Sequence, residues 1–387
     1  MTKKKGTAVS LKFKFLDQVF AAFNTYLLLI PSLFQKDFDS IAKMSLIVSL
    51  FAFWQSLIRI SVINEVLDFR NESTRFLNHV TRVIKISISS FVLIFLAEWL
   101  KIALSQVLIL IGVILTGVQV ELVRQYWLGK EKFLIALFVD LSWFCPSVLI
   151  ISLQVFNFDS LLPWLIGALI SLGIGLTTLK RETHSVVQQT NIVKVSSLML
   201  TIPILLALYT VLQNAIYSGS VGSIQLGQLR TIQLFFLPAI FLIGVQQSVF
   251  VPPMTQGKIY EVNRIWHSLK WLSLTISMVG AFFAELYFHA EYRNLTVLSL
   301  ILLVILSVQV NLRVGYLSLW LLTSGFGLKL IIARVIWFVT SISVMFSQRN
   351  ELKIGLVGLL LVDLGFMFYL NFRVGEKLRV KKNVKCL

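Results

Sequence analysis

The sequence predicts an all-α protein that crosses a membrane many times. Hydrophobic residues make up 57% of its 387 residues, charged residues make up only 14%, and the mean hydropathy is +0.84. Soluble domains are roughly 45–50% apolar and about 25% charged. Apolar runs of about 20 residues, the length that crosses a hydrocarbon core, recur along the whole chain. The chain is therefore expected to be a polytopic membrane protein.

About twelve such runs follow one another with short connections. Backbone amides and carbonyls have no water to bind in lipid, so runs this long and apolar are expected to be helices. The predicted spans cover residues 15–34, 41–66, 83–100, 102–123, 133–155, 161–179, 195–217, 232–251, 271–288, 297–322, 330–346 and 354–370. The connections are too short to hold a soluble domain.

The distribution of Lys and Arg predicts the orientation of these spans. With the N-terminus inside, 25 of the 35 basic residues, Arg124 among them, fall on the inner side, 7 on the outer side and 3 within spans. Short cytoplasmic loops carry such an excess, so both termini are expected in the cytoplasm. The net charge of +17 is spread over these loops. It indicates topology and contact with anionic lipid heads, and no nucleic-acid partner.

The chain is predicted to consist of two lobes of six helices each. The polar interruption LKRETHSVVQQTNIVKV, residues 179–195, falls at the midpoint. An even number of spans per half gives both halves the same orientation, as in transporters built from parallel repeats. The expected division is an N-terminal lobe, 1–190, and a C-terminal lobe, 191–387, with a basic cytoplasmic tail.

The first span carries polar residues on one face. In LDQVFAAFNTYLLLIPSLF, residues 16–34, a helical period places Asp17, Gln18 and Asn24 on one side together with small residues. Such a face is costly against lipid, so it must meet another helix or water inside the bundle. Two interpretations remain open: these side chains join helices by hydrogen bonds, or they line a cavity.

Arginines also lie at membrane depth. Arg59 falls about two-thirds along the second span, Arg313 lies inside the tenth, and Arg230 opens the eighth beside Gln233. An arginine at the bilayer centre costs at least about 2.5–3.5 kcal/mol, so each is expected to have a role. They either form structural ion pairs or line a cationic cavity that grips phosphate oxygens bidentately.

The candidate partners for such ion pairs are acids in or near the spans. They are Asp17, Glu65, Glu121, Asp140 and Asp363. A further arginine, Arg334, lies near the inner end of the eleventh span and is predicted to reach the interface by snorkelling.

Signatures of enzymes, cofactors and metals are absent from the sequence. No G-x-x-x-x-G-K-[ST] motif occurs, so ATP hydrolysis is not expected. The four histidines lie far apart with no metal-binding spacing, and Cys145 and Cys386 fall in a span and in the tail. The chain is expected to have no catalytic residues and no bound metal.

Three stretches resemble a known family. The opening LDQVFAAFNTYLLLIPSLF and the second span FAFWQSLIRISVINEVL are similar to the start of polysaccharide-export flippases in the multidrug/oligosaccharidyl-lipid/polysaccharide (MOP) exporter superfamily. LRTIQLFFLPAIFLIGVQQSVFVPPM, residues 229–254, resembles the start of their second lobe. The chain departs from the family pattern at Glu65-Val66, where a proline is often found.

The resemblance implies a MATE-like fold and a flippase that moves an undecaprenyl-pyrophosphate-linked oligosaccharide, such as an O-antigen unit, across a bacterial inner membrane. Other polysaccharide-assembly membrane proteins are the implied partners. Arg59, Arg230 and Arg313 are the candidate pyrophosphate ligands. The candidates for sugar contact or gating are Asp17, Gln18, Asn24, Gln246 and Gln247. Asp17 and Asp363 are the candidate carriers of a coupling proton or sodium ion, and no other cofactor is expected.

Three other classes of protein make different demands on the residues. An ion-coupled multidrug antiporter of the same superfamily would favour an acidic cavity. A multipass glycosyltransferase or polysaccharide polymerase would need a sizeable outer loop with carboxylates or arginines, and the outer loops here are short. A structural scaffold would not explain arginines at depth.

The twelve-span topology predicts which connections face the cytoplasm. A cysteine placed in residues 179–195 should react with an impermeant thiol reagent only after the cells are opened. A cysteine in residues 217–228 should react in intact cells. Labelling of both connections from the same side would contradict the topology.

Overall fold

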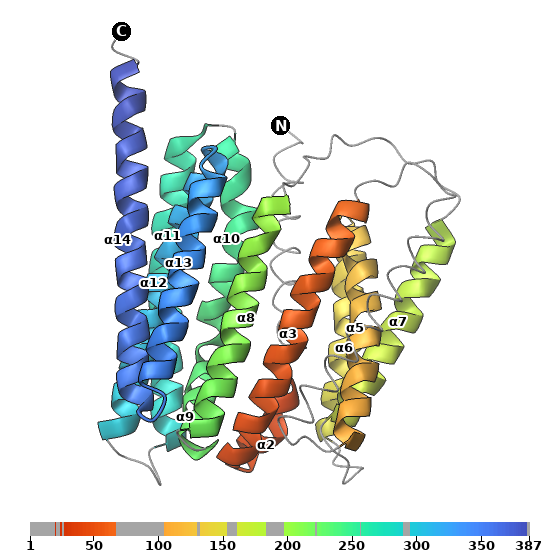
Figure 1. Ribbon diagram of the computed structural model, residues 1–387. Coiled ribbons are helices and arrows are strands. Elements are labelled where there is room, and N and C mark those ends of the chain that lie inside the picture. Colours follow the sequence, from red (N-terminus) through yellow and green to blue (C-terminus); the bar gives the residue numbers. More distant parts are fainter. Residues whose placement is uncertain are drawn as a thin grey trace. The chain divides into compact units, whose positions relative to one another are not determined.

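The computed structural model describes residues 20, 24, 27–66, 104–129, 132–152, 161–182, 197–220, 223–255, 257–288 and 295–384. Within these ranges the regular elements are helices (Figure 1). The predicted span at 83–100, Asp17 and Gln18 lie outside the described residues. The all-helical prediction is confirmed there, whereas the number of twelve spans and the position of the termini stay predictions.

The chain divides into two compact units. Unit 1 comprises Met1–Pro31 and Leu50–Ser197, and unit 2 comprises Ser32–Ser49 and Leu198–Leu387. The predicted lobe boundary at residue 190 stays a prediction. The segment Ser32–Ser49 belongs to unit 2, although its neighbours on both sides in the chain belong to unit 1.

In the described part of unit 1, α5 (Leu104–Gly129), α6 (Phe133–Ser152) and α7 (Leu161–Glu182) pack against one another. Side chains bond directly to the backbone of the neighbouring helix. Ser171 Oγ donates to the Val139 carbonyl at 2.7 Å, and Trp143 Nε1 donates to the Trp164 carbonyl at 3.2 Å. Polar residues that hydrogen-bond across helices in this way are a usual form of membrane helix association.

Unit 2 contains the start of α3 and seven further helices, of which α11 to α14 stand side by side (Figure 1). The seven are α8 (Ser197–Ser220), α9 (Ser223–Phe235), α10 (Leu237–Thr255), α11 (Ile259–Phe288), α12 (Leu295–Thr323), α13 (Gly327–Ser347) and α14 (Leu352–Val384). Their buried faces form two clusters of apolar side chains.

The predicted span 232–251 contains a break that was not predicted. The helix is interrupted at Phe236, and α9 and the first turns of α10 meet at an angle of 70°. Pro238 has no amide hydrogen and disfavours a helical conformation at the residue before it, so the helix restarts there. At Gly280 of α11 an added Cβ would lie 2.6 Å from the Phe235 carbonyl oxygen, so a glycine is needed beside the break.

Helix α3 (Phe38–Val66) belongs to both units, because the boundary passes between Ser49 and Leu50. Its start packs into unit 2. The Phe38 ring stacks on Phe288 with centroids 5.8 Å apart, and Asn214 Nδ2 donates to the Ser45 carbonyl at 3.3 Å. Gly227 of α9 touches the Phe38 backbone, so this corner of the chain is part of the core of unit 2.

The N-terminus of α3 is capped by the residue before it. Ser40 donates to the Asp37 carboxylate from its hydroxyl at 2.6 Å and from its backbone N–H at 3.1 Å. These two bonds lower the pKa of the exposed Asp37 carboxyl below its ordinary value, the hydroxyl bond being the larger cause. The bond from the Ser40 amide satisfies an N–H group that has no partner within the helix.

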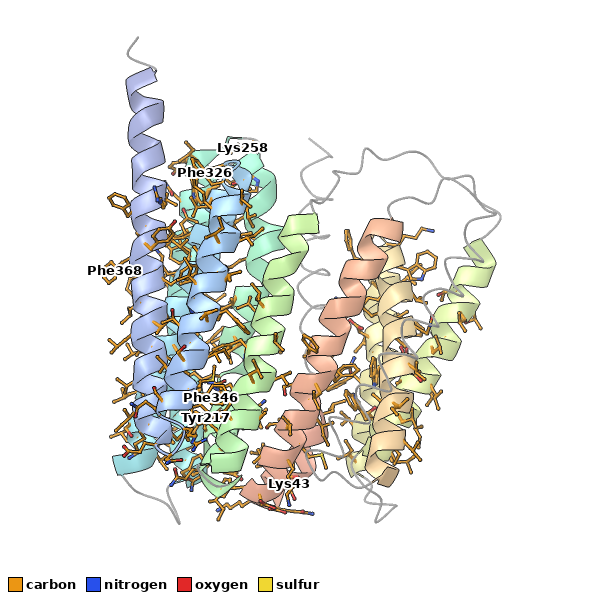
Figure 2. All side chains as sticks on the ribbon, viewed as in Figure 1. Lys43, Tyr217, Lys258, Phe326, Phe346 and Phe368 are labelled. Carbon is orange, nitrogen blue, oxygen red and sulfur yellow. The ribbon has the colours of Figure 1, made fainter. Side chains whose placement is uncertain are left out.

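The outer surfaces of the helices are apolar. Among the described residues, five helices are long and apolar enough to cross a membrane, and a sixth span results if the bent pair α9 and α10 counts as one. Phe368 on α14 is 65% exposed and points away from its neighbours (Figure 2). Because large exposed apolar surfaces are rare in soluble monomers, these faces are suited to lipid.

Side chains labelled in Figure 2 mark the two ends of unit 2. Lys258 and Phe326 mark one end, and Lys43, Tyr217 and Phe346 lie towards the other (Figure 2). Helix α14 continues beyond the ends of α11 to α13 (Figure 1). Its 33 residues correspond to about 50 Å, more than a bilayer core requires.

The contact between α9 and the start of α3 predicts that Gly227 tolerates no side chain. A Cβ there would lie 2.0 Å from the Phe38 carbonyl oxygen, a backbone atom. Gly227→Ala should therefore lower the melting temperature of the purified protein in detergent, by the equivalent of about 1–3 kcal/mol. Gly365→Ala is the matched control, since its Cβ would meet no atom within 4 Å. Equal melting temperatures for the two variants would contradict the close contact.

Candidate functional site: charged and polar groups between the helices

Unit 1 encloses three charged side chains between α5 and α6. Arg124 is fully buried and pairs through Nε with Asp140 Oδ2 at 2.9 Å and through Nη1 with Glu121 Oε2 at 3.0 Å. Glu121 and Asp140 were both predicted as partners for arginines at depth. The guanidinium that holds them belongs to Arg124, which we predicted only as an inner-side residue. Removal of one partner from such a network would leave a buried charge uncompensated, so we expect the network to stabilise unit 1.

Asn24, from the predicted polar face of the first span, is buried in unit 1. Its Nδ2 donates to the Asp140 backbone carbonyl at 3.2 Å. This contact joins the first span to α6, as expected if Asn24 links helices by hydrogen bonds. The cavity-lining role of Asn24 stays a prediction.

Arg230 lies in unit 2, half buried and surrounded by amide side chains. Its Nη1 donates to Gln233 Oε1, one turn further along α9, as the sequence suggested. Its Nη2 donates to Asn214 Oδ1 and, at 3.2 Å, to Gln213 Oε1 on α8. These amide oxygens accept hydrogen bonds from the guanidinium and orient it.

Arg313, on α12, lies against aromatic rings. Its guanidinium carbon lies 5.1 Å from the centroid of Trp266 and 5.3 Å from that of Tyr316, and these two rings stack 4.4 Å apart. Nη2 donates to Asn371 Oδ1 at 3.2 Å. Within the described residues its partners are thus two aromatic rings and an amide. The ring faces attract the cation and hold it in place, and none of these described partners carries a negative charge.

Arg334, on α13, is 4% exposed, so the prediction that it snorkels is wrong. Its guanidinium carbon lies 4.7 Å from the Phe366 centroid and 5.3 Å from that of Trp337. Its Nη2 donates to Ser318 Oγ at 3.3 Å. Two aromatic residues and a serine from three helices therefore enclose this cation inside unit 2.

Asp363, on α14, is buried beside the same aromatic group. Trp337 Nε1 donates to its Oδ1 at 2.7 Å, and Asn311 Nδ2 faces its Oδ2 at 3.4 Å. The Tyr209 ring of α8 lies 5.0 Å from the Trp337 ring. Trp337 thus contacts a buried carboxylate through its N–H and a buried guanidinium through its ring face.

The remaining candidate residues are placed only in part. Gln246 is buried between α10 and α12, where its Nε2 donates to the Leu312 carbonyl at 2.7 Å. Gly315 leaves room for it, since a Cβ there would lie 2.2 Å from Gln246 Oε1. Arg59 and Gln247 lie in α3 and α10, but their side chains are outside the described part of the structure. The roles of these residues in binding stay predictions.

The sequence contained a partial signal for the residues that we missed. Glu121 and Arg124 are three residues apart on one helix, a spacing at which side chains meet. The second partner, Asp140, lies on another helix and gives no local signal. Trp337 was missed because a tryptophan in an apolar span looks like any other lipid-facing or core residue. Among the described residues, no three His, Cys, Asp or Glu side chains gather closely enough to hold a metal ion.

Comparison with known proteins gives matches in structure and none in sequence. No protein-family model matches the chain, and no curated protein does. A multidrug resistance MATE family transporter of the MOP superfamily in its inward-facing conformation aligns with a TM-score of 0.58 at 11% identity, over 95% of both chains. A MATE protein in the bent conformation gives 0.58 at 11% identity, over 97% of this chain and 96% of the other.

A third solved structure is a MOP superfamily transporter from Pyrococcus furiosus Vc1. It aligns with a TM-score of 0.52 at 12% identity, over 96% of this chain and 93% of the other. The description of that protein states that the reverse polarity of its binding pocket suggests a different function. At these identities the likeness shows the fold. The chain has the fold of MOP-superfamily membrane transporters and is a multi-pass membrane protein.

The buried charges of unit 1 predict a large effect of removing their cation. Arg124→Ala leaves Glu121 and Asp140 without it, which should destabilise the protein by about 3–5 kcal/mol and lower its abundance in membranes. Lys43→Ala is the control, because the Lys43–Asp39 pair lies on the surface and should contribute less than about 1 kcal/mol. Adding Glu121→Gln and Asp140→Asn to Arg124→Ala should restore part of the loss. An Arg124→Ala protein as abundant as the wild type would show that the network is not structural.

Proposed function

We propose that the protein is a flippase that moves an oligosaccharide linked to undecaprenyl pyrophosphate from the inner to the outer leaflet of a bacterial inner membrane, for polysaccharide biosynthesis. The MOP-superfamily fold supports a transporter. The cationic side chains inside unit 2 support an anionic substrate. A pyrophosphate head cannot cross hydrocarbon unaided, whereas a path that offers fixed guanidinium groups can compensate its charge.

The observation that carries the proposal is the environment of Arg313. This guanidinium is half buried, is held by two ring faces and one amide oxygen, and has no carboxylate partner within the described residues. A structural arginine in a membrane is expected to pair with an acid, as Arg124 does. Arg313 instead keeps donors and positive charge that suit phosphate oxygens.

The surroundings of Arg230 add to this support. Gln213 and Asn214 on α8 and Gln233 on α9 contact the guanidinium through amide oxygens, and their amide groups also suit sugar hydroxyls. Together with Arg59 of α3, these residues are our candidates for the pyrophosphate and sugar contacts. Other polysaccharide-assembly membrane proteins are the proposed partners.

Transport of an anionic head outward is favoured by the membrane potential. About two negative charges moving out of an inside-negative cell release roughly 4–5 kcal/mol per 100 mV. Resetting of the carrier can use a coupled proton or sodium ion, for which Asp17 and Asp363 are the candidates. Asp17 lies outside the described residues, whereas Asp363 is buried in unit 2.

A multidrug antiporter is the second candidate, because solved structures with this fold include multidrug resistance transporters. Cationic drugs would require acidic groups, and Asp363 is one such group. The described charges inside unit 2 also include the buried Arg334 and the half-buried Arg313. A relative described as having a pocket of reverse polarity is a precedent for an altered substrate within this fold.

The proposal predicts a specific behaviour of arginine variants. Arg313→Ala should abolish surface glycan in the producing strain at normal protein abundance, because the arginine binds the substrate and neutralises no acid. Arg313→Lys should stay impaired, since an ammonium group lacks the bidentate fork. Arg59→Ala and Arg59→Lys should behave in the same way. The measurements are surface glycan, protein abundance in membranes and resistance to a cationic dye.

The control variant is Arg349→Ala, at an exposed position beyond the end of α13. It should leave glycan export unchanged. If removal of an acid such as Glu65 together with Arg59 restored export, Arg59 would be a structural partner and not a ligand. Loss of dye resistance with normal surface glycan in the Arg313 variants would favour the multidrug antiporter instead.

A further inference from the structure

The carboxylate of Asp363 is surrounded by hydrogen-bond donors. Trp337 Nε1 can only donate, and it contacts Oδ1 at 2.7 Å. Asn311 Nδ2 faces Oδ2 at 3.4 Å and also donates to the Ser307 carbonyl oxygen at 3.0 Å. A carbonyl oxygen only accepts, so the bond to Ser307 fixes which end of the Asn311 amide points at Asp363. Both carboxylate oxygens therefore face N–H groups.

The charged and titratable groups that face Asp363 come from two other helices. Arg334 of α13 acts on it through its positive charge, and Tyr209 of α8 lies within its electrostatic reach. Helix α12 contributes the neutral Asn311. In the described part of the chain, the Arg334 guanidinium is directed to Ser318 and to the rings of Trp337 and Phe366.

This arrangement is unsuited to a sodium ion. Hard metal cations are bound by several oxygen ligands. Among the described residues, the groups that contact the carboxylate are an indole N–H and an amide N–H, and a sodium ion would also be repelled by the nearby charge of Arg334. A proton requires no such ligands, because it forms a single O–H bond to the carboxylate.

We propose that Asp363 is a proton-binding site from which sodium is excluded, and that its proton weakens the link between α14 and α12. A proton on Oδ2 turns an acceptor into an O–H donor that faces the Asn311 N–H, so two donors oppose each other. Oδ1 keeps its bond from Trp337, so α14 stays joined to α13. The step adds one proton from solution to one carboxylate oxygen. A role of this proton in driving transport rests on the proposed function. The binding of the proton to Asp363 does not.

The test is a pH titration of the purified full-length protein in detergent, followed by the infrared carbonyl absorption of protonated carboxyl groups. Acidification in potassium chloride should produce a band that is missing in Asp363→Asn and present in Glu261→Gln, which changes an exposed acid of α11. Its midpoint should not move when sodium chloride replaces potassium chloride. A midpoint that falls in sodium would show that sodium competes for the site and would overturn the proposal.

A second variant keeps the test decisive if Asp363→Asn does not fold. Trp337→Phe keeps an aromatic ring, although a smaller one, beside Arg334, Phe366 and Tyr209, and it removes the N–H that stabilises the carboxylate. The midpoint of the band should then move about one pH unit higher, a tenfold gain in proton affinity. An unchanged midpoint would overturn the assignment to Asp363. No glycan is present, so failure here and failure of glycan export in the arginine variants are separate results.

Discussion

The structure depends on one constraint: a polar group inside a lipid bilayer has no water to bind and must find its partner within the protein. Short polar side chains meet this requirement locally, as when Thr116 Oγ1 donates to the Gly112 carbonyl one turn before it. Longer side chains meet it across helices, as Trp143 and Gln246 do. These cross-helix bonds fix which faces of the helices meet, since apolar contact with a neighbour is hardly better than contact with lipid.

Charge is accommodated in two different ways within the two units. In unit 1, Arg124 is compensated by two carboxylates, so little of its charge acts beyond the core. In unit 2, the rings and hydroxyl around Arg334 leave it close enough to Asp363 for the two charges to interact. Arg313 is instead surrounded by aromatic rings and an amide, and these neutral groups orient the cation without cancelling its charge. The first arrangement contributes to stability, whereas the second keeps a positive potential inside the protein that a substrate anion can use.

The positions of the helices could largely be predicted from the sequence, because membrane thickness sets the length of an apolar run. The predicted span 161–179 compares with the helix Leu161–Glu182, and 297–322 with Leu295–Thr323. The break at Phe236 was missed, because the apolar run continues through it and only Pro238 indicates an interruption. Pairings between helices were also missed: nothing near Asp363 in the sequence points to Trp337, 26 residues away. The bond from Arg230 to Gln233 was the exception, because both residues lie on one helix.

Helix α3 begins in one compact unit and ends in the other, and this limits how the chain can be divided. Cutting the chain near its midpoint would separate unit 2 from Phe38 and Ile41, which lie in its apolar core. A C-terminal half made alone would lack these side chains and leave Gly227 without its neighbour. The two units are therefore not interchangeable modules. Exchange of a half between related proteins would have to carry Ser32–Ser49 along with the C-terminal part, although that segment lies near the N-terminus of the chain.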